Sequence, residues 1–292
     1  MHQPVLLKEV LEFLAPRAGG VYMDGSLGTG GYAEAILEAA SPDGILLGFD
    51  IDEDSIHQTT KRLEHYGKRF RCWHAGYHEA FLTLDSMGIG QLNGIVLDLG
   101  LSSDQLENPN RGFSFRFSGP LDMRFNRSIG ESAEDLLKSA SESKLQRIIS
   151  EYGEERRAKK IAQRLKQGVS KGTLKTTGDL ADVVLRALGG KKGRIHPATR
   201  VFQALRIAVN DELGKLKKGL EQLPNLLKQH GRLCVVSYHS LEDRMVKLAF
   251  KELARDKSKW RILTPRPLRS SSEERISNPR SRSAKMRVIE LL

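Results

Sequence analysis

The first hundred residues alternate short apolar runs with stretches of helical periodicity. The apolar runs, which are typical of buried strands, lie at residues 21–24, 45–50, 70–74 and 94–98. The stretches between them predict helices near residues 31–40, 53–65 and 78–87. Continuous apolar strands that alternate with helices indicate a parallel sheet covered on both faces. The pattern therefore predicts an α/β fold with a Rossmann-like sheet.

The alternation stops after Asp98. Residues 99–112 read as a polar loop, residues 131–188 as basic helices, and residues 188–194 as a flexible basic loop rich in glycine. We therefore expect an inserted all-helical domain at residues 106–196. It interrupts a sheet domain made of residues 1–105 and 197–292.

The sheet pattern returns in the last third of the chain. Residues 198–228 are expected to be helical, residues 233–237 to form a strand, and residues 241–253 to form a helix. Residues 260–263 and 286–292 are predicted to close the sheet as an antiparallel pair, and residues 265–283 between them read as a loop.

A glycine-rich turn joins the first strand to the first helix in the sequence Tyr22-Met-Asp-Gly-Ser-Leu-Gly-Thr-Gly-Gly-Tyr-Ala-Glu34. Gly28, Gly30 and Gly31 allow a tight turn and a close approach of the backbone to a ligand. The start of the helix offers unpaired N–H groups and a partial positive charge. Asp50, at the end of the next strand, can bind a pair of ribose hydroxyls. The motif predicts the nucleotide corner of the sheet.

Asp24 helps to choose among the ligands that fit this corner. The glycines alone also fit a dinucleotide, but a carboxylate directly before the turn would repel a pyrophosphate. S-adenosylmethionine carries an ammonium that Asp24 can face and a carboxylate that the helix start can face. A methyl-donor site is therefore favoured over a nicotinamide site and over a carboxylate that only caps a turn. Because Asp24, Asp50 and Asp98 all end strands, they should converge on one edge of the sheet.

Charge divides the chain. Residues 1–105 hold 7 Lys and Arg against 15 Asp and Glu, whereas residues 106–196 hold 19 against 11. The following basic blocks bring the net charge of the chain to +11. An acidic cleft suits a cationic donor, and basic surfaces suit a polyanion such as nucleic acid; solvated helix faces without a partner are the alternative.

The composition of the chain indicates its cellular compartment. No apolar run approaches the length needed to span a membrane, and the first residues do not read as a secretion signal. The two cysteines, Cys72 and Cys234, lie far apart and are expected to be buried rather than bridged. These features favour a cytoplasmic protein.

Several longer motifs are more specific than the glycine turn. With the chain as a whole, they resemble the bacterial 16S ribosomal RNA methyltransferase H family (RsmH, formerly MraW). The motifs are His2-Gln-Pro-Val-Leu-Leu-Lys-Glu, Asp24-Gly-Ser-Leu-Gly-Thr-Gly-Gly, Asp98-Leu-Gly-Leu-Ser-Ser-Asp-Gln105, Arg111-Gly-Phe-Ser-Phe, Gly119-Pro-Leu-Asp-Met-Arg124, Tyr152-Gly-Glu-Glu-Arg156, the segment from His196 to Asn210, Ser237-Tyr-His-Ser-Leu-Glu-Asp-Arg244 and Asn278-Pro-Arg-Ser-Arg-Ser283.

The resemblance implies methyl transfer from S-adenosylmethionine to the exocyclic N4 of a cytidine. That cytidine lies in the decoding centre of 16S rRNA, at the peptidyl site, within the small ribosomal subunit. The implied fold is a Rossmann-like class I methyltransferase sheet with an inserted helical domain, and a homodimer is left open. Carried over by position, the donor site resembles that of the family at Gly30, Gly31, Tyr32, Asp50, Tyr77, Asp98 and Gln105. The family usually has His at position 32 and often Phe at position 77.

The methyl transfer that the resemblance implies also suggests a chemical role for Asp98. Methyl transfer needs an aligned nitrogen and an acceptor for its proton, and we hypothesise that Asp98 or the loop of residues 99–103 provides that acceptor. A role for Asp98 in shaping the donor pocket is the equal alternative. No residue pattern typical of a metal site is expected to act here.

Contacts with RNA are the remaining expectation. Phe113, Phe115 and Phe117 alternate and are expected to form a small core, with stacking on a base as the alternative. Arg280, Arg282 and the basic run at residues 156–166 are candidates for phosphate contacts. A nucleic-acid-binding protein that has lost its cofactor chemistry is the competing class, and the intact acidic and glycine motifs favour the enzyme.

Overall fold

The computed structural model describes residues 4–190 and 196–292, with the backbone alone at Ser103. Its contacts divide the chain into two compact units, Met1–Gly100 with Leu213–Leu292 and Leu101–Glu212. We call them the sheet unit and the helical unit. His2 and Gln3 of the first motif and residues 191–194 of the expected basic loop lie outside the described residues.

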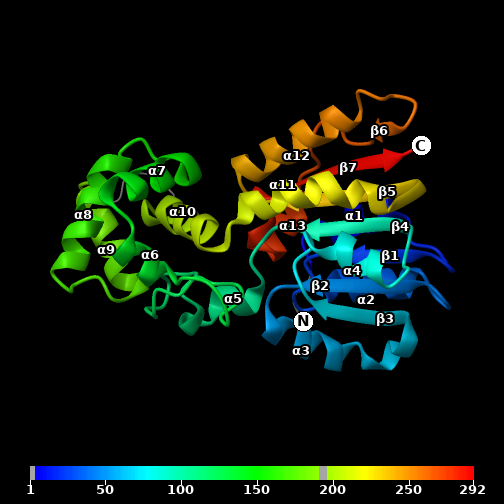
Figure 1. Cartoon of the computed structure of the whole chain (residues 1–292), viewed down its shortest axis with the longest axis horizontal. Coiled ribbons are helices and arrows are strands. Elements are labelled where there is room, and N and C mark those ends of the chain that lie inside the picture. The colour runs from blue at the N-terminus through cyan, green and yellow to red at the C-terminus, as the bar shows by residue number, and fades with distance from the viewer. Residues whose placement is uncertain (1–3, 191–195) are drawn as a thin grey trace. The chain divides into compact units, whose positions relative to one another are not determined.

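Seven strands in the described residues form one sheet (Figure 1). They are β1 (Val21–Asp24), β2 (Ile45–Asp50), β3 (Phe70–His74), β4 (Leu92–Asp98), β5 (Leu227–Ser237), β6 (Trp260–Ile262) and β7 (Lys285–Leu291). The order is β3-β2-β1-β4-β5-β7-β6, with parallel pairing from β3 to β5 and antiparallel pairing of β7 with both neighbours. The predicted Rossmann-like sheet and its antiparallel closing pair are confirmed.

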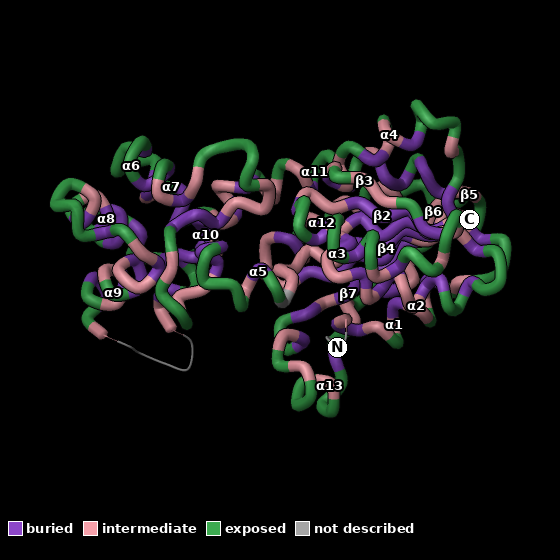
Figure 2. The backbone as a smooth tube through the Cα atoms, turned by 90° about the horizontal axis from the view of Figure 1, so that it is seen from below, coloured by how far each residue is buried: buried purple, intermediate pink, exposed green. Residues whose placement is uncertain are grey.

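Helices bury both faces of this sheet because successive strand residues point to opposite sides. On β1, Tyr22 packs with α1 (Leu7–Leu14) and α2 (Gly31–Ala39), whereas Met23 packs with α4 (Ala80–Ser86), α11 (Glu212–Gln222) and α12 (Ser240–Leu253). The first face is also covered by residues of α3 (Glu53–Arg62) and η1 (Glu64–Arg69). Most residues of β1, β2, β4 and β7 are therefore buried (Figure 2).

Two segments of the sheet unit differ from the expected elements. β5 begins at Leu227 rather than at residue 233, because the strand pairs with β4 across a register shift and contains His230 at φ 64°. The first residues of β5 are mostly polar, so they did not form an apolar run that would predict a strand. The expected loop at residues 265–283 contains α13 (Ser272–Ser277) and η4 (Pro279–Ser283), with the Ser271 hydroxyl accepting the Glu274 N–H at the helix start. η3 (Leu223–Leu226) precedes β5.

The helical unit has its own hydrophobic core. Its helices are α5 (Ser103–Glu107), η2 (Pro109–Arg111), α6 (Ala133–Ser139), α7 (Glu142–Gly153), α8 (Ala158–Ser170), α9 (Thr177–Ala187) and α10 (Ala198–Asn210). The described part of this unit contains no strand, only an isolated bridge between Pro120 and Thr176. α5 and η2 lie within the segment expected to be a polar loop.

The division of the chain differs from the expected boundaries. We expected the insertion at residues 106–196, whereas the helical unit spans Leu101–Glu212 and includes α10. α10 belongs to the helical unit because its apolar face packs there: Val201, Phe202 and Leu205 are buried in the core of that unit. No helix in the described residues is long and apolar enough to cross a membrane.

Candidate active site at the carboxyl edge of the sheet

Asp24, Asp50 and Asp98 lie together at one edge of the sheet, as the strand pattern predicts. Each ends a strand, and their strands are neighbours in the order β2-β1-β4 with parallel pairing. Parallel strands present their carboxyl ends at the same edge, so the three carboxylates meet there.

Asp24 is fully buried, and only one of its oxygens is satisfied. Its Oδ1 accepts the Ser26 N–H at 3.0 Å and the Ser26 hydroxyl at 3.5 Å. Its Oδ2 is shielded from solvent and has no hydrogen-bond partner among the described residues. A buried carboxylate oxygen without a donor is costly, so this atom marks a place for a cationic or donating group of a ligand.

Ser26 connects Asp24 to the neighbouring strand. The Ser26 hydroxyl donates to Asp24 Oδ1, and its oxygen accepts the backbone N–H of Asp98 at 2.6 Å. One side chain in the glycine turn thereby fixes the end of β4 beside the end of β1.

The glycine turn leads into α2 with backbone angles that favour glycine. Gly28 has φ 48° and Gly30 has φ 78°, and a Cβ on Gly30 would lie 2.5 Å from the Thr59 methyl. The first backbone bond of the helix runs from the Glu34 N–H to the Gly30 oxygen at 2.9 Å. The amides of Gly31 and Tyr32 therefore have no acceptor within the helix and can bind an anionic group.

Asp50 is held by two backbone amides. Its Oδ2 accepts the Gly28 N–H at 2.7 Å, and its Oδ1 accepts the Asp52 N–H at 2.8 Å. An ionised carboxylate has about four lone-pair sites, so both oxygens keep capacity for hydroxyl donors. These bonds fix the carboxylate against the glycine turn, where a ribose hydroxyl pair would need it.

Among the described residues, one oxygen of the Asp98 carboxylate is hydrogen-bonded and the other is not. It accepts hydrogen bonds from the Tyr238 hydroxyl and the Gly100 N–H. The Tyr238 ring lies close over Gly100, where a Cβ would be 2.6 Å from the Tyr238 Cε2 atom. Asp98 Oδ1 is shielded from solvent and has no hydrogen-bond partner in the described part of the chain.

Burial dominates the protonation of all three acids. Burial, together with the charges of Asp50 and Asp98, raises the pKa of Asp24 to about 7 against the opposing hydrogen bonds from Ser26. Burial raises the pKa of Asp50 to about 6 against the Asp52 and Gly28 amides. It raises the pKa of Asp98 to about 6 against the Tyr238 hydroxyl and the Gly100 amide. Such perturbed groups, gathered at a sheet edge, mark a functional site.

Comparison with known proteins identifies the family. The model of the MraW methylase family matches residues 1–292, the whole chain. The chain belongs to the MraW methylase family. The family resemblance predicted from the motifs is thereby confirmed.

Curated relatives align with the chain over nearly all of their length. The ribosomal RNA small subunit methyltransferase H of Trichlorobacter lovleyi is 47% identical over 307 aligned residues, covering 100% of this chain and 98% of the relative. The protein of that name from Geobacter sulfurreducens is 46% identical over 307 residues, covering 100% and 99%. A solved SAM-dependent O-methyltransferase from Thermotoga maritima is 10% identical, with a TM-score of 0.44, covering 99% of this chain and 67% of that one.

The two tyrosines at family donor positions use their side chains differently. The Tyr32 ring is buried, and its hydroxyl donates to the Val5 carbonyl oxygen, so only its backbone N–H faces outward from the helix start. The Tyr77 ring packs against the backbone of Gly219, where a Cβ would be 2.8 Å from two ring atoms. Tyr77 lies just after β3, at the same sheet edge as the acids.

Gln105 is in the helical unit, where its side chain caps its own helix. Its Oε1 accepts the Ser102 N–H at 3.0 Å, and the Ser102 hydroxyl accepts the Gln105 N–H at 3.1 Å. This capping box gives Gln105 a structural task, and its expected contact with the donor stays a prediction.

Sequence reasoning missed Ser26 and Tyr238. Both lie inside quoted motifs of the MraW methylase family, but the partner that they share, Asp98, is on another strand and distant in the chain. His239 and Glu242 were noted in the same motif: the Glu242 carboxylate accepts the N–H groups of Tyr238 and His239, at 2.9 Å and 3.3 Å, at the start of α12. This capping fixes the backbone that carries Tyr238.

Proposed function

We propose that this chain transfers a methyl group from S-adenosylmethionine to the N4 amine of a cytidine in 16S rRNA. The products are N4-methylcytidine and S-adenosylhomocysteine. Membership of the MraW methylase family and the names of its relatives support methylation of small-subunit rRNA. The decoding-centre cytidine follows from the motif resemblance. A cytoplasmic location, the ribosomal subunit as substrate and a homodimer stay predictions.

The observation that carries the proposal is the unsatisfied oxygen of Asp24 beside the amides of α2. A ligand for this corner needs a cationic or donating group for Asp24 and an anionic group for the helix start. The ammonium and the carboxylate of S-adenosylmethionine fit both, and a pyrophosphate fits only the second. Asp50 would hold the ribose hydroxyls, and Tyr77 would offer an aromatic face to the adenine.

S-adenosylmethionine supplies a methyl group that its positive sulfur already activates. The protein therefore has to position the acceptor nitrogen and handle charge, and good alignment alone is worth about 7–11 kcal/mol of the barrier. Three carboxylates at the sheet edge also stabilise a positively charged donor electrostatically.

Asp98 is our candidate for the group that faces the cytosine amine. The amine is a weak nucleophile because its lone pair is delocalised into the ring. Asp98 Oδ1 is shielded and has no hydrogen-bond partner among the described residues, so it can accept an amine N–H and localise that lone pair. Because burial raises the pKa of Asp98 only to about 6, the carboxylate is largely ionised at pH 7 and can take up the proton that the amine loses.

Tyr238 would act as a positioning residue for Asp98. The hydrogen bond from the Tyr238 hydroxyl and the packing of the Tyr238 ring over Gly100 hold the Asp98 carboxylate in one orientation. The free oxygen is then aimed without the need for reorganisation.

The test is methylation in vitro with methyl-labelled S-adenosylmethionine and small ribosomal subunits from a host that lacks the gene. Nucleoside mass spectrometry of the digested rRNA should find label only in N4-methylcytidine, at one position. Label in another nucleoside, or none on either subunits or free 16S rRNA, would refute the proposal.

The role of Asp98 needs a separate variant. Asp98→Asn should bind the donor within a few fold of wild type but methylate at least a hundredfold more slowly, in line with loss of a general base. Full-rate methylation by Asp98→Asn would remove Asp98 from catalysis and leave it a role in shaping the donor pocket.

A further inference from the structure

Phe117 is an exposed aromatic residue in the helical unit, although the sequence pattern placed it in a core with Phe113 and Phe115. Phe113 is buried and stacks on Phe125 with ring centroids 5.3 Å apart. Phe115 packs at 4.9 Å against Phe202 of α10. Phe117 is 55% exposed. The expected three-ring core is therefore wrong for its third member.

The loop that carries Phe117 has a closed, tightly packed base. Gly112 has φ 73°, and a Cβ there would lie 2.4 Å from the Pro120 oxygen. A Cβ on Gly119 would lie 2.0 Å from the Pro109 oxygen. The two ends of the loop therefore meet backbone to backbone and leave no room for a side chain, and residues 113–118 project from this base.

Thr177, fully buried at the start of α9, clamps the exposed end of the loop. Its hydroxyl donates to the Phe117 carbonyl oxygen at 3.3 Å and accepts the Gly119 N–H at 3.0 Å. Its own N–H donates to the Gly119 oxygen at 2.9 Å. Together with the Ser114 hydroxyl, which accepts the Arg116 N–H at 3.1 Å, these bonds turn the third ring outward.

One exposed arginine lies beside the Phe117 ring, and a second lies on the segment at the base of the loop. The Arg116 guanidinium carbon lies 5.6 Å from the Phe117 ring centroid, and the Arg116 residue is itself exposed. At the base of the loop, the Arg111 oxygen accepts the Met123 N–H at 3.0 Å, so residues 122–127 lie beside it. The exposed Arg127 reaches Asp122 there, with Nε 3.5 Å from Oδ2.

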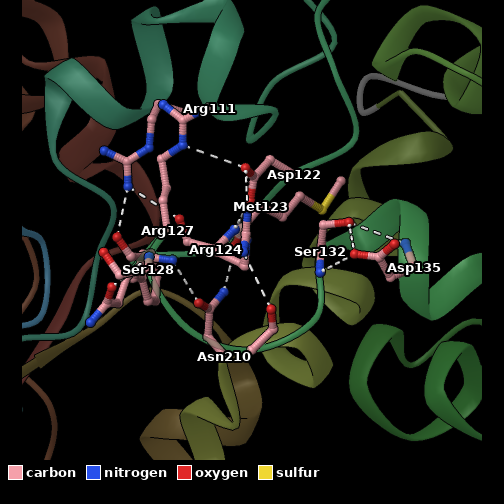
Figure 3. Close-up of polar contacts among 12 residues, drawn as sticks. Arg111, Asp122, Met123, Arg124, Arg127, Ser128, Ser132, Asp135 and Asn210 are labelled. Atoms are coloured by element: carbon pink, nitrogen blue, oxygen red, sulfur yellow. Dashed lines mark hydrogen bonds and ion pairs between the residues drawn. The ribbon is translucent and has the colours of Figure 1, made fainter.

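The neighbouring segment is anchored as firmly as the loop (Figure 3). Buried Arg111 donates to the carbonyl oxygens of Arg124 and Phe125, at 3.1 Å and 2.9 Å. Asn210 accepts the Phe125 N–H at 2.8 Å and donates to the Met123 oxygen at 2.7 Å. The Asp122 carboxylate accepts a hydrogen bond from the Arg124 Nε–H at 2.7 Å. The arginines therefore extend from a fixed backbone.

A single exposed apolar side chain is normal on a protein surface, and Leu82 and Ile129 are also exposed. Phe117 differs because its backbone is clamped, its ring is aromatic and the Arg116 guanidinium lies beside that ring. An aromatic face next to arginines matches an unpaired base with its flanking phosphates. A rigid carrier also lowers the entropy lost on binding.

We propose that Phe117 is a stacking platform for an unpaired base of the RNA substrate, with Arg116 and Arg127 contacting the phosphates beside it. This inference rests on the proposed function, since it assigns part of the RNA surface for that reaction. It concerns recognition of the RNA and no step of the chemistry.

The test measures binding of a fluorescently labelled, unstructured oligoribonucleotide to the full-length protein. Phe117→Ala should weaken binding about tenfold, since stacking on one base is worth about 1–3 kcal/mol. Phe117→Tyr should keep near wild-type affinity because the ring is retained. Leu82→Ala, a comparably exposed apolar residue in the sheet unit, is the matched control and should change nothing. Thermal unfolding and donor calorimetry verify that each variant is folded.

A second readout reports the stacking itself. In Phe117→Trp, the added indole fluorescence should be quenched by the oligoribonucleotide, beyond any change seen in wild-type protein, which has 2 Trp. Wild-type affinity in Phe117→Ala, or no added quenching in Phe117→Trp, would overturn the platform while rRNA methylation by the wild type kept the proposed function. Wild-type protein that neither binds RNA nor methylates rRNA would defeat both. A protein partner at this loop would show as RNA affinity unchanged by Phe117→Ala.

Discussion

At the scale of single residues, three acids define the candidate site. Asp24, Asp50 and Asp98 share one sheet edge, and burial raises the pKa of each, with mutual repulsion contributing at Asp24. A cationic donor relieves that repulsion. The same arrangement that disfavours ionisation in the free protein therefore favours binding of an ammonium and a sulfonium.

Asp24→Asn tests this relation. The amide keeps the size of the side chain but loses the charge, so affinity for S-adenosylmethionine should fall about 10- to 100-fold, as expected for a hydrogen bond between charged groups. Isothermal calorimetry measures it. Asp85→Asn is the control, because Asp85 is exposed on α4, and it should bind the donor normally. Equal affinity of the two variants for S-adenosylmethionine would show that Asp24 does not contact the donor.

The pH dependence of stability tests the burial. The folded pKa of Asp24, about 7, lies above its ordinary value of 3.8, so the folded state favours the protonated form. This contribution to stability is complete below about pH 4 and is lost as the pH rises through about 7. Asp24→Asn cannot ionise, so its unfolding free energy minus that of the wild type should rise between pH 4 and pH 8. Urea unfolding across that range gives the difference, and a flat difference would contradict the raised pKa.

The sequence revealed these acids because each directly follows an apolar run. It did not reveal Ser26 or Tyr238 as part of the site. Ser26 matters because its hydroxyl bridges two strands, and Tyr238 because β5 lies beside β4. Such roles follow from strand neighbours, which no local pattern encodes. The Tyr32 hydroxyl donates to the Val5 oxygen, so the donor contact inferred for this position stays a prediction for its backbone N–H.

At the scale of elements, periodicity predicted the strands that carry the acids and the helices between them. It failed where polar residues or short capped turns form the element. The first residues of β5 are polar, and α5 depends on the capping box between Ser102 and Gln105. The loop around Phe117 was also misjudged, because Thr177 turns it and lies far along the chain.

Asn210, at the end of α10, tests how one element holds another. Asn210→Ala would leave the Phe125 N–H and the Met123 oxygen without this partner, and a buried group left unsatisfied typically costs about 1–3 kcal/mol. We expect a loss of about 2–4 kcal/mol in the free energy of unfolding, measured by chemical denaturation. Asn225→Ala, an exposed amide bonded only to the Glu221 oxygen in the described contacts, should lose less than about 0.5 kcal/mol. Similar losses would argue against the anchor.

At the scale of the whole molecule, charge separates along the chain. The acidic segment at residues 1–105 contains the three carboxylates, and the basic segment at residues 106–196 belongs to the helical unit. The sequence predicted an inserted helical domain but placed its end before α10, because a helix alone does not reveal which core it joins. The basic run at residues 156–166 is only partly available to RNA: Lys159 and Lys160 are exposed, whereas Lys166 donates to the Leu137 carbonyl oxygen at 3.1 Å.

The charge separation predicts that RNA binding weakens steeply with salt. The double variant Lys159→Glu and Lys160→Glu should bind more weakly, and its slope of log affinity against log salt should be shallower by about 1.4, if each lysine neutralises one phosphate of a single strand. Filter binding over a salt series measures both. The charge-matched variant Lys61→Glu and Lys68→Glu, exposed in the acidic segment, should keep the wild-type slope. A wild-type slope near zero would exclude the basic surface as the RNA site.

The most direct measurement is a crystal structure of the protein with S-adenosylhomocysteine, which retains the ammonium, carboxylate, ribose and adenine of the donor. We expect the ammonium at Asp24 Oδ2, the carboxylate at the α2 amides and the ribose hydroxyls at Asp50. A ligand bound away from the ends of β1 and β2, or one with its ammonium turned from Asp24, would contradict the account.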